Sequence, residues 1–156
     1  MHSLYFFRVF FVSAEALVLV GTWLAYVRFG SELESAAISL LLNEEVVKYL
    51  MLLPTALAVW IIKETRVLLQ EDKETILILT DWPDYWKLKV HTWVSLGYAI
   101  LFAFISLLPW IAKSGIGNGT GLLLFVASLI GQLTLAVSIY NARIRVKEII
   151  VHVKAL

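Results

Sequence analysis

The sequence predicts an all-α integral membrane protein with four transmembrane helices and a small cytosolic layer. Four apolar runs of 17 to 22 residues recur along the chain, and roughly 20 such residues cross the hydrocarbon core as a helix. Hydrophobic residues make up 60% of the chain, compared with roughly 45–50% in soluble domains. Lipid offers no partner to backbone amides, so each crossing is expected to be helical. We therefore expect one membrane domain over residues 1–156, with spans at 9–27, 46–62, 90–111 and 121–140.

The first predicted span, residues 9–27, carries an ionisable residue, Glu15, near its middle. Its apolar run is longer than the roughly 7–15 residues of a cleaved signal peptide, so we expect it to be retained as one helix. The following loop, residues 28–45, is acidic. Within it, Ser35 is suited to cap a helix that lies along the membrane surface before the second span.

The second span, residues 46–62, contains Pro54, which removes one backbone hydrogen bond and marks either a hinge or a packing feature. The segment 63–89 is expected in the cytosol. Within it, residues 66–80 fit either a β-hairpin around a polar quartet or a continuation of the second helix. Proline is tolerated in the first turn of a helix, so a new helix is expected to begin at Trp82-Pro83 and to lead into the third span.

The fourth span, residues 121–140, follows a glycine-rich stretch that favours a short turn. Residues 141–156 form the expected cytosolic tail. From Arg143 to Lys147 the tail alternates cationic and apolar residues, which is typical of a strand, but the same residues also fit an extension of the fourth helix. Both interpretations stay open at this point.

The Lys and Arg residues beside the spans predict the orientation, because such residues are retained on the cytoplasmic side of a membrane. With both termini cytoplasmic, nine cations lie on the inner side and three on the outer side. This distribution predicts a basic cytosolic face that binds an acidic protein partner or anionic lipid headgroups. The residues assigned to this face are Arg66, Lys73, Lys87, Lys89, Arg143, Arg145 and Lys147.

Glu15 is the first candidate functional residue, because an ionisable side chain within hydrocarbon needs a partner or a role. One hypothesis is that Glu15 is a proton site, which would alternate between charged and neutral forms. Arg8 and Gln132 are further polar groups expected in the same intramembrane region. The structural alternative is a protonated carboxyl group hydrogen-bonded to Ser13, to Gln132 or to a second copy of the chain. We favour this structural alternative over transport.

The pair Ala14-Glu15 resembles the first helix of the small multidrug resistance transporters, four-helix inner-membrane proteins whose essential glutamate directly follows a small residue. The resemblance covers a handful of residues and the number of helices. It implies proton-coupled transport with Glu15 as the proton site. The chain departs from that family in its greater length, in its charged segment between the second and third spans, and in its tail, so the resemblance is an analogy.

No residue pattern indicates catalysis. The acidic residues lie on opposite predicted faces of the membrane, and His2, His91 and His152 are too scattered for a metal site, with His91 expected to be an interfacial residue. The lack of cysteine excludes thiol chemistry. A net charge of +1 gives no electrostatic basis for direct nucleic-acid binding. We expect a non-enzymatic protein without a cofactor or metal.

The preferred functional hypothesis is a small membrane subunit that acts by protein–protein interaction. It either anchors or signals to a cytosolic or membrane partner, or neutralises a membrane-active toxin as immunity and defence proteins do. The alternative is an oligomeric ion channel or small proton-coupled transporter that uses Glu15. Polar groups within the membrane favour a closed homo-oligomer surrounded by lipid. The compactness of the chain favours a bacterial inner membrane.

Overall fold

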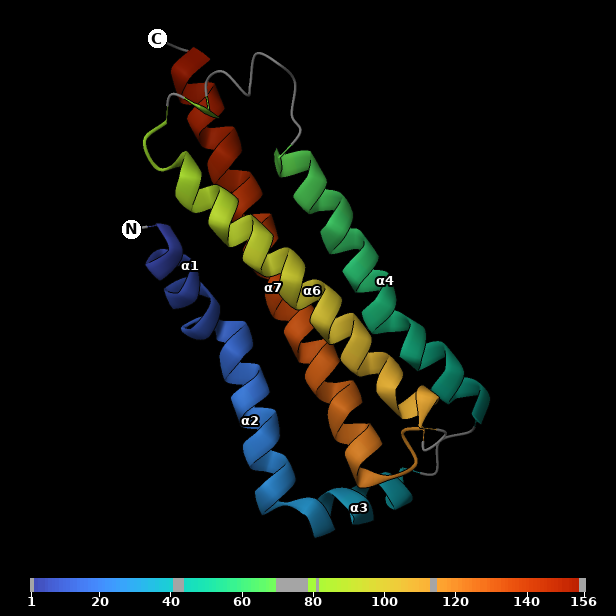
Figure 1. Cartoon of the computed structure of the whole chain (residues 1–156). Coiled ribbons are helices and arrows are strands. Elements are labelled where there is room, and N and C mark those ends of the chain that lie inside the picture. The colour runs from blue at the N-terminus through green and yellow to red at the C-terminus, as the bar shows by residue number, and fades with distance from the viewer. Residues whose placement is uncertain (1, 41–43, 70–78, 81, 113–114, 155–156) are drawn as a thin grey trace.

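The computed structural model describes residues 2–40, 44–69, 79–80, 82–112 and 115–154. This part of the chain is helical apart from short turns and contains no strand (Figure 1). In chain order the helices are α1 (His2–Phe11), α2 (Ala14–Arg28), α3 (Gly30–Ser39), α4 (Glu44–Leu69), α6 (Tyr85–Ile111) and α7 (Gly119–Lys154).

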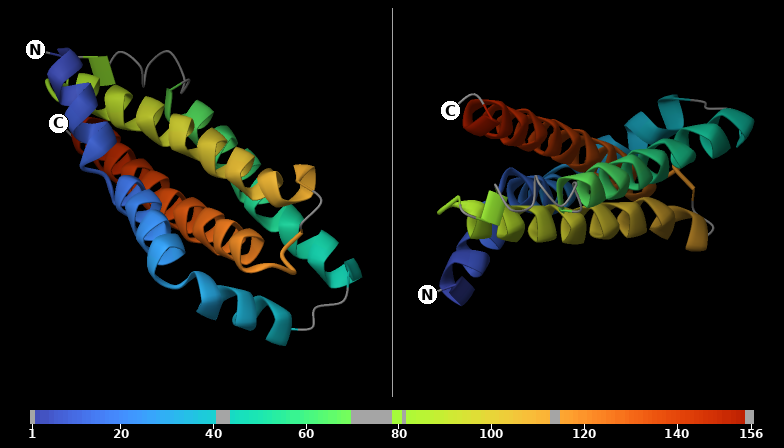
Figure 2. Two further views of the ribbon diagram at one scale, coloured as in Figure 1. Left: turned by 60° about the horizontal axis from the view of Figure 1, so that its bottom comes forward. Right: turned by 90° about the horizontal axis from the view of Figure 1, so that it is seen from above.

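Helix α7 is at the centre of the bundle. It packs against α2, α3, α4 and α6, while α6 also packs against α4 and α1. Both chain termini lie at one end of the bundle, and α3 lies across the opposite end (Figures 1 and 2). The buried core is centred on Tyr98 and Phe102 of α6, Leu135 and Ile139 of α7, and Ile61 of α4.

The two longest apolar helices, α6 and α7, have the length and composition needed to cross a membrane. A third crossing results if α1 and α2 are taken together, with a bend of 48° between them. The prediction that residues 9–27 form one helix is therefore wrong. The membrane crossing by residues 46–62 of α4 stays a prediction.

Residues 66–80, for which the sequence allows a β-hairpin or a helix, are helical where the structure describes them. Helix α4 continues to Leu69, so residues 66–69 are not a strand. Residues 70–78, which include Lys73, lie outside the described part of the chain. Helix α6 begins at Tyr85, three residues after the predicted start at Trp82-Pro83.

The tail extends the fourth helix, because α7 continues without a break to Lys154. Two contacts hold the tail against the bundle. The side chain of Val146 is buried in the core, and Arg143 Nη1 lies 2.5 Å from Glu64 Oε2 of α4. The helical interpretation of residues 143–154 is confirmed.

Helix α3 occupies the acidic loop after the first span. It begins at Gly30, so Ser35 lies within the helix rather than at the predicted cap, and its hydroxyl donates to the Glu32 carbonyl at 2.9 Å. The Glu34 carboxylate accepts a hydrogen bond of 2.7 Å from the Gly119 N–H at the start of α7. A Cβ on Gly119 would lie 2.6 Å from the backbone nitrogen of Glu34. Glycine at this position thus allows α3 to pack directly on α7.

Candidate functional site

Side-chain hydrogen bonds stabilise the break between α1 and α2. Ser13 is the N-cap of α2, and its Oγ accepts a hydrogen bond of 3.1 Å from the Ala16 N–H. The same hydroxyl donates to the Phe10 carbonyl at 3.3 Å. Tyr98 of α6 donates to that carbonyl from across the bundle at 2.6 Å. Backbone groups released by the break are thereby paired within the protein.

Glu15 lies in the first turn of α2, directly after the break, and only 7% of it is exposed. It lines a cavity of about 480 Å³ between α1, α2, α6 and α7, which we call the Glu15 cavity. No described residue donates a hydrogen bond to its carboxylate or forms an ion pair with it. The other polar residues of the lining are Tyr5, Arg8, Ser13, His91, Ser95, Thr134 and Ser138.

Two of the hydroxyl groups around the Glu15 cavity are oriented by the backbone. Thr134 Oγ1 donates to the Ile130 carbonyl at 2.9 Å, and Ser13 Oγ donates to the Phe10 carbonyl. A hydroxyl whose proton is used in this way has only acceptor capacity left. Together with the Glu15 carboxylate, these groups place acceptors around the cavity, and Arg8 adds a side chain that has only donors.

A second pocket of about 620 Å³, which we call the mouth pocket, lies between the beginning of α6 and the last part of α7. It shares Tyr5, His91 and Ser138 with the Glu15 cavity, so the two spaces are adjacent. The mouth pocket lies at the end of the bundle that carries both termini. Polar groups thus extend from this end of the bundle to Glu15.

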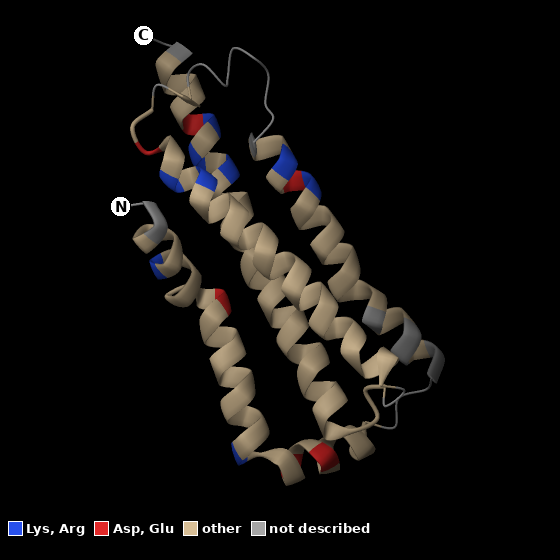
Figure 3. Ribbon diagram, viewed as in Figure 1, with Lys and Arg blue, Asp and Glu red and all other residues tan. Residues whose placement is uncertain are grey.

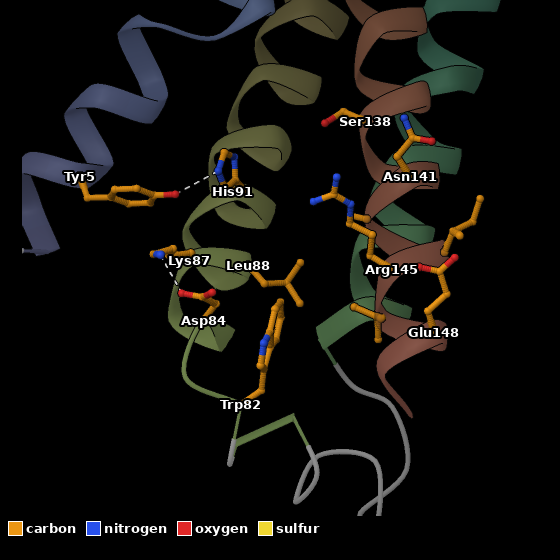
Figure 4. A pocket seen from close by; sticks show the side chains of 13 residues that line it. Tyr5, Trp82, Asp84, Lys87, Leu88, His91, Ser138, Asn141, Arg145 and Glu148 are labelled. Carbon is orange, nitrogen blue, oxygen red and sulfur yellow. Dashed lines mark hydrogen bonds and ion pairs between the residues drawn. The ribbon is translucent and has the colours of Figure 1, made fainter. Parts of the chain in front are cut away.

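Charged side chains line the mouth pocket on two sides (Figure 4). Asp84 and Lys87 of the α6 side form an ion pair of 2.7 Å, and Arg145 and Glu148 lie opposite on α7. Tyr5 of α1 points toward His91, and its hydroxyl lies 3.2 Å from His91 Nε2. This contact lies where the mouth pocket and the Glu15 cavity meet.

The predicted basic face lies at the end of the bundle with the termini (Figure 3). Arg66, Lys89, Arg145 and Lys147 are exposed there. Two other cations of this set have acidic partners, because Lys87 pairs with Asp84 and Arg143 pairs with Glu64. Acidic residues of α3 lie at the opposite end (Figure 3).

Of the three alternative partners expected for a protonated Glu15, Ser13 and Gln132 are bonded elsewhere, so these two alternatives are wrong, and a hydrogen bond to a second copy of the chain stays a prediction. Ser13 is bonded to the backbone of the helix break. Gln132 is fully buried away from the Glu15 cavity, and its Nε2 donates to the Ala99 carbonyl at 2.8 Å, which joins α7 to α6. Arg8 lines the cavity but forms no ion pair with Glu15 within the described residues. Pro54 lies buried inside α4.

Sequence reasoning missed the polar residues that surround Glu15 from α6 and α7. The sequence pattern predicts His91 to be an interfacial residue and assigns no role to Thr134 or Ser138. A signal was present, because His91 and Ser95, like Thr134 and Ser138, are four residues apart and so lie on one face of their helices. Polar residues at this spacing within apolar spans indicate a polar stripe that faces the protein interior.

Comparison of the chain with known protein families, with curated proteins and with solved structures finds no match. No relative therefore assigns a role to Glu15, to His91 or to the cavity.

Proposed function

We propose that the protein moves protons across a membrane, as a small channel or proton-coupled transporter, and that Glu15 binds the proton in transit. The observation that carries this proposal is the broken helix beside a buried carboxylate. Discontinuous transmembrane helices are typical of ion and substrate sites in transporters, and an ionisable residue at membrane depth is functional by default. The adjacent mouth pocket supports proton entry from the end with the termini.

Glu15 has the position that a proton carrier needs. It lies in the first turn of α2, directly after the break, and only 7% of it is exposed. The Glu15 cavity meets the mouth pocket at Tyr5, His91 and Ser138. A proton that enters the mouth pocket therefore has a polar route to this carboxylate.

We propose further that both termini are cytoplasmic and that the chain crosses a bacterial inner membrane four times, through α1 with α2, α4, α6 and α7. The basic end of the bundle supports this orientation, since Lys and Arg are retained on the cytoplasmic side. A homo-oligomer is part of the proposal, because a second copy beside the bundle would enclose polar groups that otherwise meet lipid. Lipid surrounds the rest of this assembly.

Proton flux into liposomes tests the proposed function. Protein is reconstituted into potassium-loaded vesicles, valinomycin sets a negative interior potential, and an enclosed pH dye reports proton entry. Wild type is expected to acidify the interior, and Glu15→Gln, which removes the titratable group but keeps its size, is expected to abolish this flux. Glu32→Gln is the matched control, because Glu32 is exposed at the other end of the bundle. A wild type without flux, or an active Glu15→Gln variant, contradicts the proposal.

A second candidate function is docking of an acidic protein partner on the basic face, by which the protein anchors, signals or confers immunity. The observation that favours it is the continuation of α7 to Lys154, with Arg145 and Lys147 exposed. Affinity purification in mild detergent, read by native mass spectrometry, is expected to recover a partner that Lys147→Glu loses. Arg28→Glu, a charge reversal at the other end of the bundle, is expected to retain it. Equal recovery with both variants contradicts docking on this face.

A further inference from the structure

The mouth pocket and the Glu15 cavity share two titratable residues, His91 and Tyr5. His91 is exposed, so water in the mouth pocket reaches the imidazole. Its position four residues before Ser95 directs both side chains of α6 to the same side as Glu15. Histidine is the side chain whose ordinary titration lies nearest to neutral pH. His91 thus lines both pockets and belongs to the residue type that titrates nearest to neutral pH, whereas Glu15 lines only the Glu15 cavity.

Tyr5 fixes the imidazole at this position. Its hydroxyl lies 3.2 Å from His91 Nε2, and its ring packs edge-on against Trp86 with centroids 4.8 Å apart. A tyrosine hydroxyl donates to the Nε2 of a neutral imidazole and accepts from the Nε2–H of an imidazolium. The same contact therefore holds His91 in both protonation states.

The charged residues of the two pockets that meet at His91 are equal in number. The Glu15 cavity contains Arg8 of α1 and Glu15 of α2. The mouth pocket contains Asp84 and Lys87 of the α6 end, and Arg145 and Glu148 of α7. Three acids and three bases thus line the two spaces that His91 connects.

We propose that His91 is the relay that passes protons between the mouth pocket and Glu15, with Tyr5 as the positioning residue. A hydronium ion in the mouth pocket gives its proton to the neutral imidazole and becomes water. The imidazolium then loses one ring proton, through water in the Glu15 cavity, to the Glu15 carboxylate. The imidazole returns to its neutral form, and the net change is one proton moved to Glu15. This inference rests on the proposed proton translocation.

Proton flux in the same liposomes tests the relay. His91→Gln keeps a polar side chain but removes titration, and it is expected to lower the flux at least about tenfold, since a positioned proton-transfer group typically contributes a factor of 10²–10⁴. It is also expected to remove the step that an imidazole contributes to the pH profile. Tyr5→Phe is expected to lower the flux less. His152→Gln is the matched control, because His152 lies in the tail outside both pockets.

Chemical rescue separates a relay from a structural role. In His91→Ala, free imidazole added to the liposomes is expected to restore flux, whereas Glu15→Gln gains nothing from imidazole. Unchanged flux in His91→Gln, or a loss in His91→Ala that imidazole does not restore, overturns the relay. A wild type without Glu15-dependent flux instead overturns the proposed function itself, so the two failures are distinguishable.

Discussion

Three side chains at the helix break show how single residues create the site. Ser13 starts α2 and thereby gives Glu15 a first-turn position, while Tyr98 pairs the Phe10 carbonyl that the break releases. Sequence reasoning found Glu15, because a charge within an apolar run is conspicuous. It did not find Tyr98, since the contact joins residues 88 positions apart and an aromatic residue in an apolar span carries no signal of a hydrogen bond.

Removing the Tyr98 hydroxyl is expected to loosen the break without changing the core. Tyr98→Phe keeps the ring that stacks on Phe10 at 4.8 Å but loses the hydrogen bond to the Phe10 carbonyl, which is expected to cost about 1 kcal/mol of unfolding free energy. Thermal unfolding in detergent measures this as a lower midpoint. Tyr140→Phe, at an exposed position, is the control and is expected to leave the midpoint unchanged. Equal midpoints for both variants would count against a structural role for the hydroxyl.

At the scale of elements, the apolar runs predicted where helices lie but not how they begin, end or break. The first apolar run is interrupted at Ser13, where the sequence has neither proline nor glycine. Hydrophobicity alone therefore predicts one continuous helix. The alternating tail was compatible with a strand, and the choice of helix depends on tertiary contacts, namely burial of Val146 and the pair of Arg143 with Glu64 of α4. Such contacts are absent from local sequence patterns.

The contact between α6 and α7 depends on Gly131. A Cβ at this position would overlap the ring of Phe102, which is fully buried. Gly131→Ala is therefore expected to lower the unfolding free energy by about 1–3 kcal/mol through overpacking. Gly97→Ala is the matched control, because a Cβ on Gly97 meets no atom within 4 Å, and it is expected to raise stability by up to about 1 kcal/mol. Chemical unfolding in detergent compares the two, and an equal response contradicts the close packing of α6 on α7.

At the scale of the whole molecule, the bundle has charged groups at both ends and a polar route leading inward from one of them. Composition and charge distribution were sufficient to predict helices and a basic end. The route was not predictable, because its walls come from α1, α2, α6 and α7, and only the packing of these helices brings Glu15 near His91 and Ser138.

The route predicts water at a defined position in the bundle. The chain has no cysteine, so one introduced by Ser138→Cys is unique. The thiolate is the form of cysteine that attacks a thiol reagent, and it forms in water rather than in lipid. This cysteine is therefore expected to react at least about tenfold faster with a charged reagent than one from Val137→Cys. Val137 is 61% exposed but lines neither pocket. Similar rates at the two positions would argue against a hydrated route.

Infrared titration of the reconstituted protein tests most directly whether Glu15 takes up and releases a proton in the membrane. The predicted result is a carboxylic acid C=O band that appears on acidification in wild type, disappears reversibly on return to higher pH, and is missing from the difference spectrum of Glu15→Gln. If wild type and Glu15→Gln give the same difference spectrum across this range, Glu15 does not exchange a proton there and the proposed mechanism is wrong.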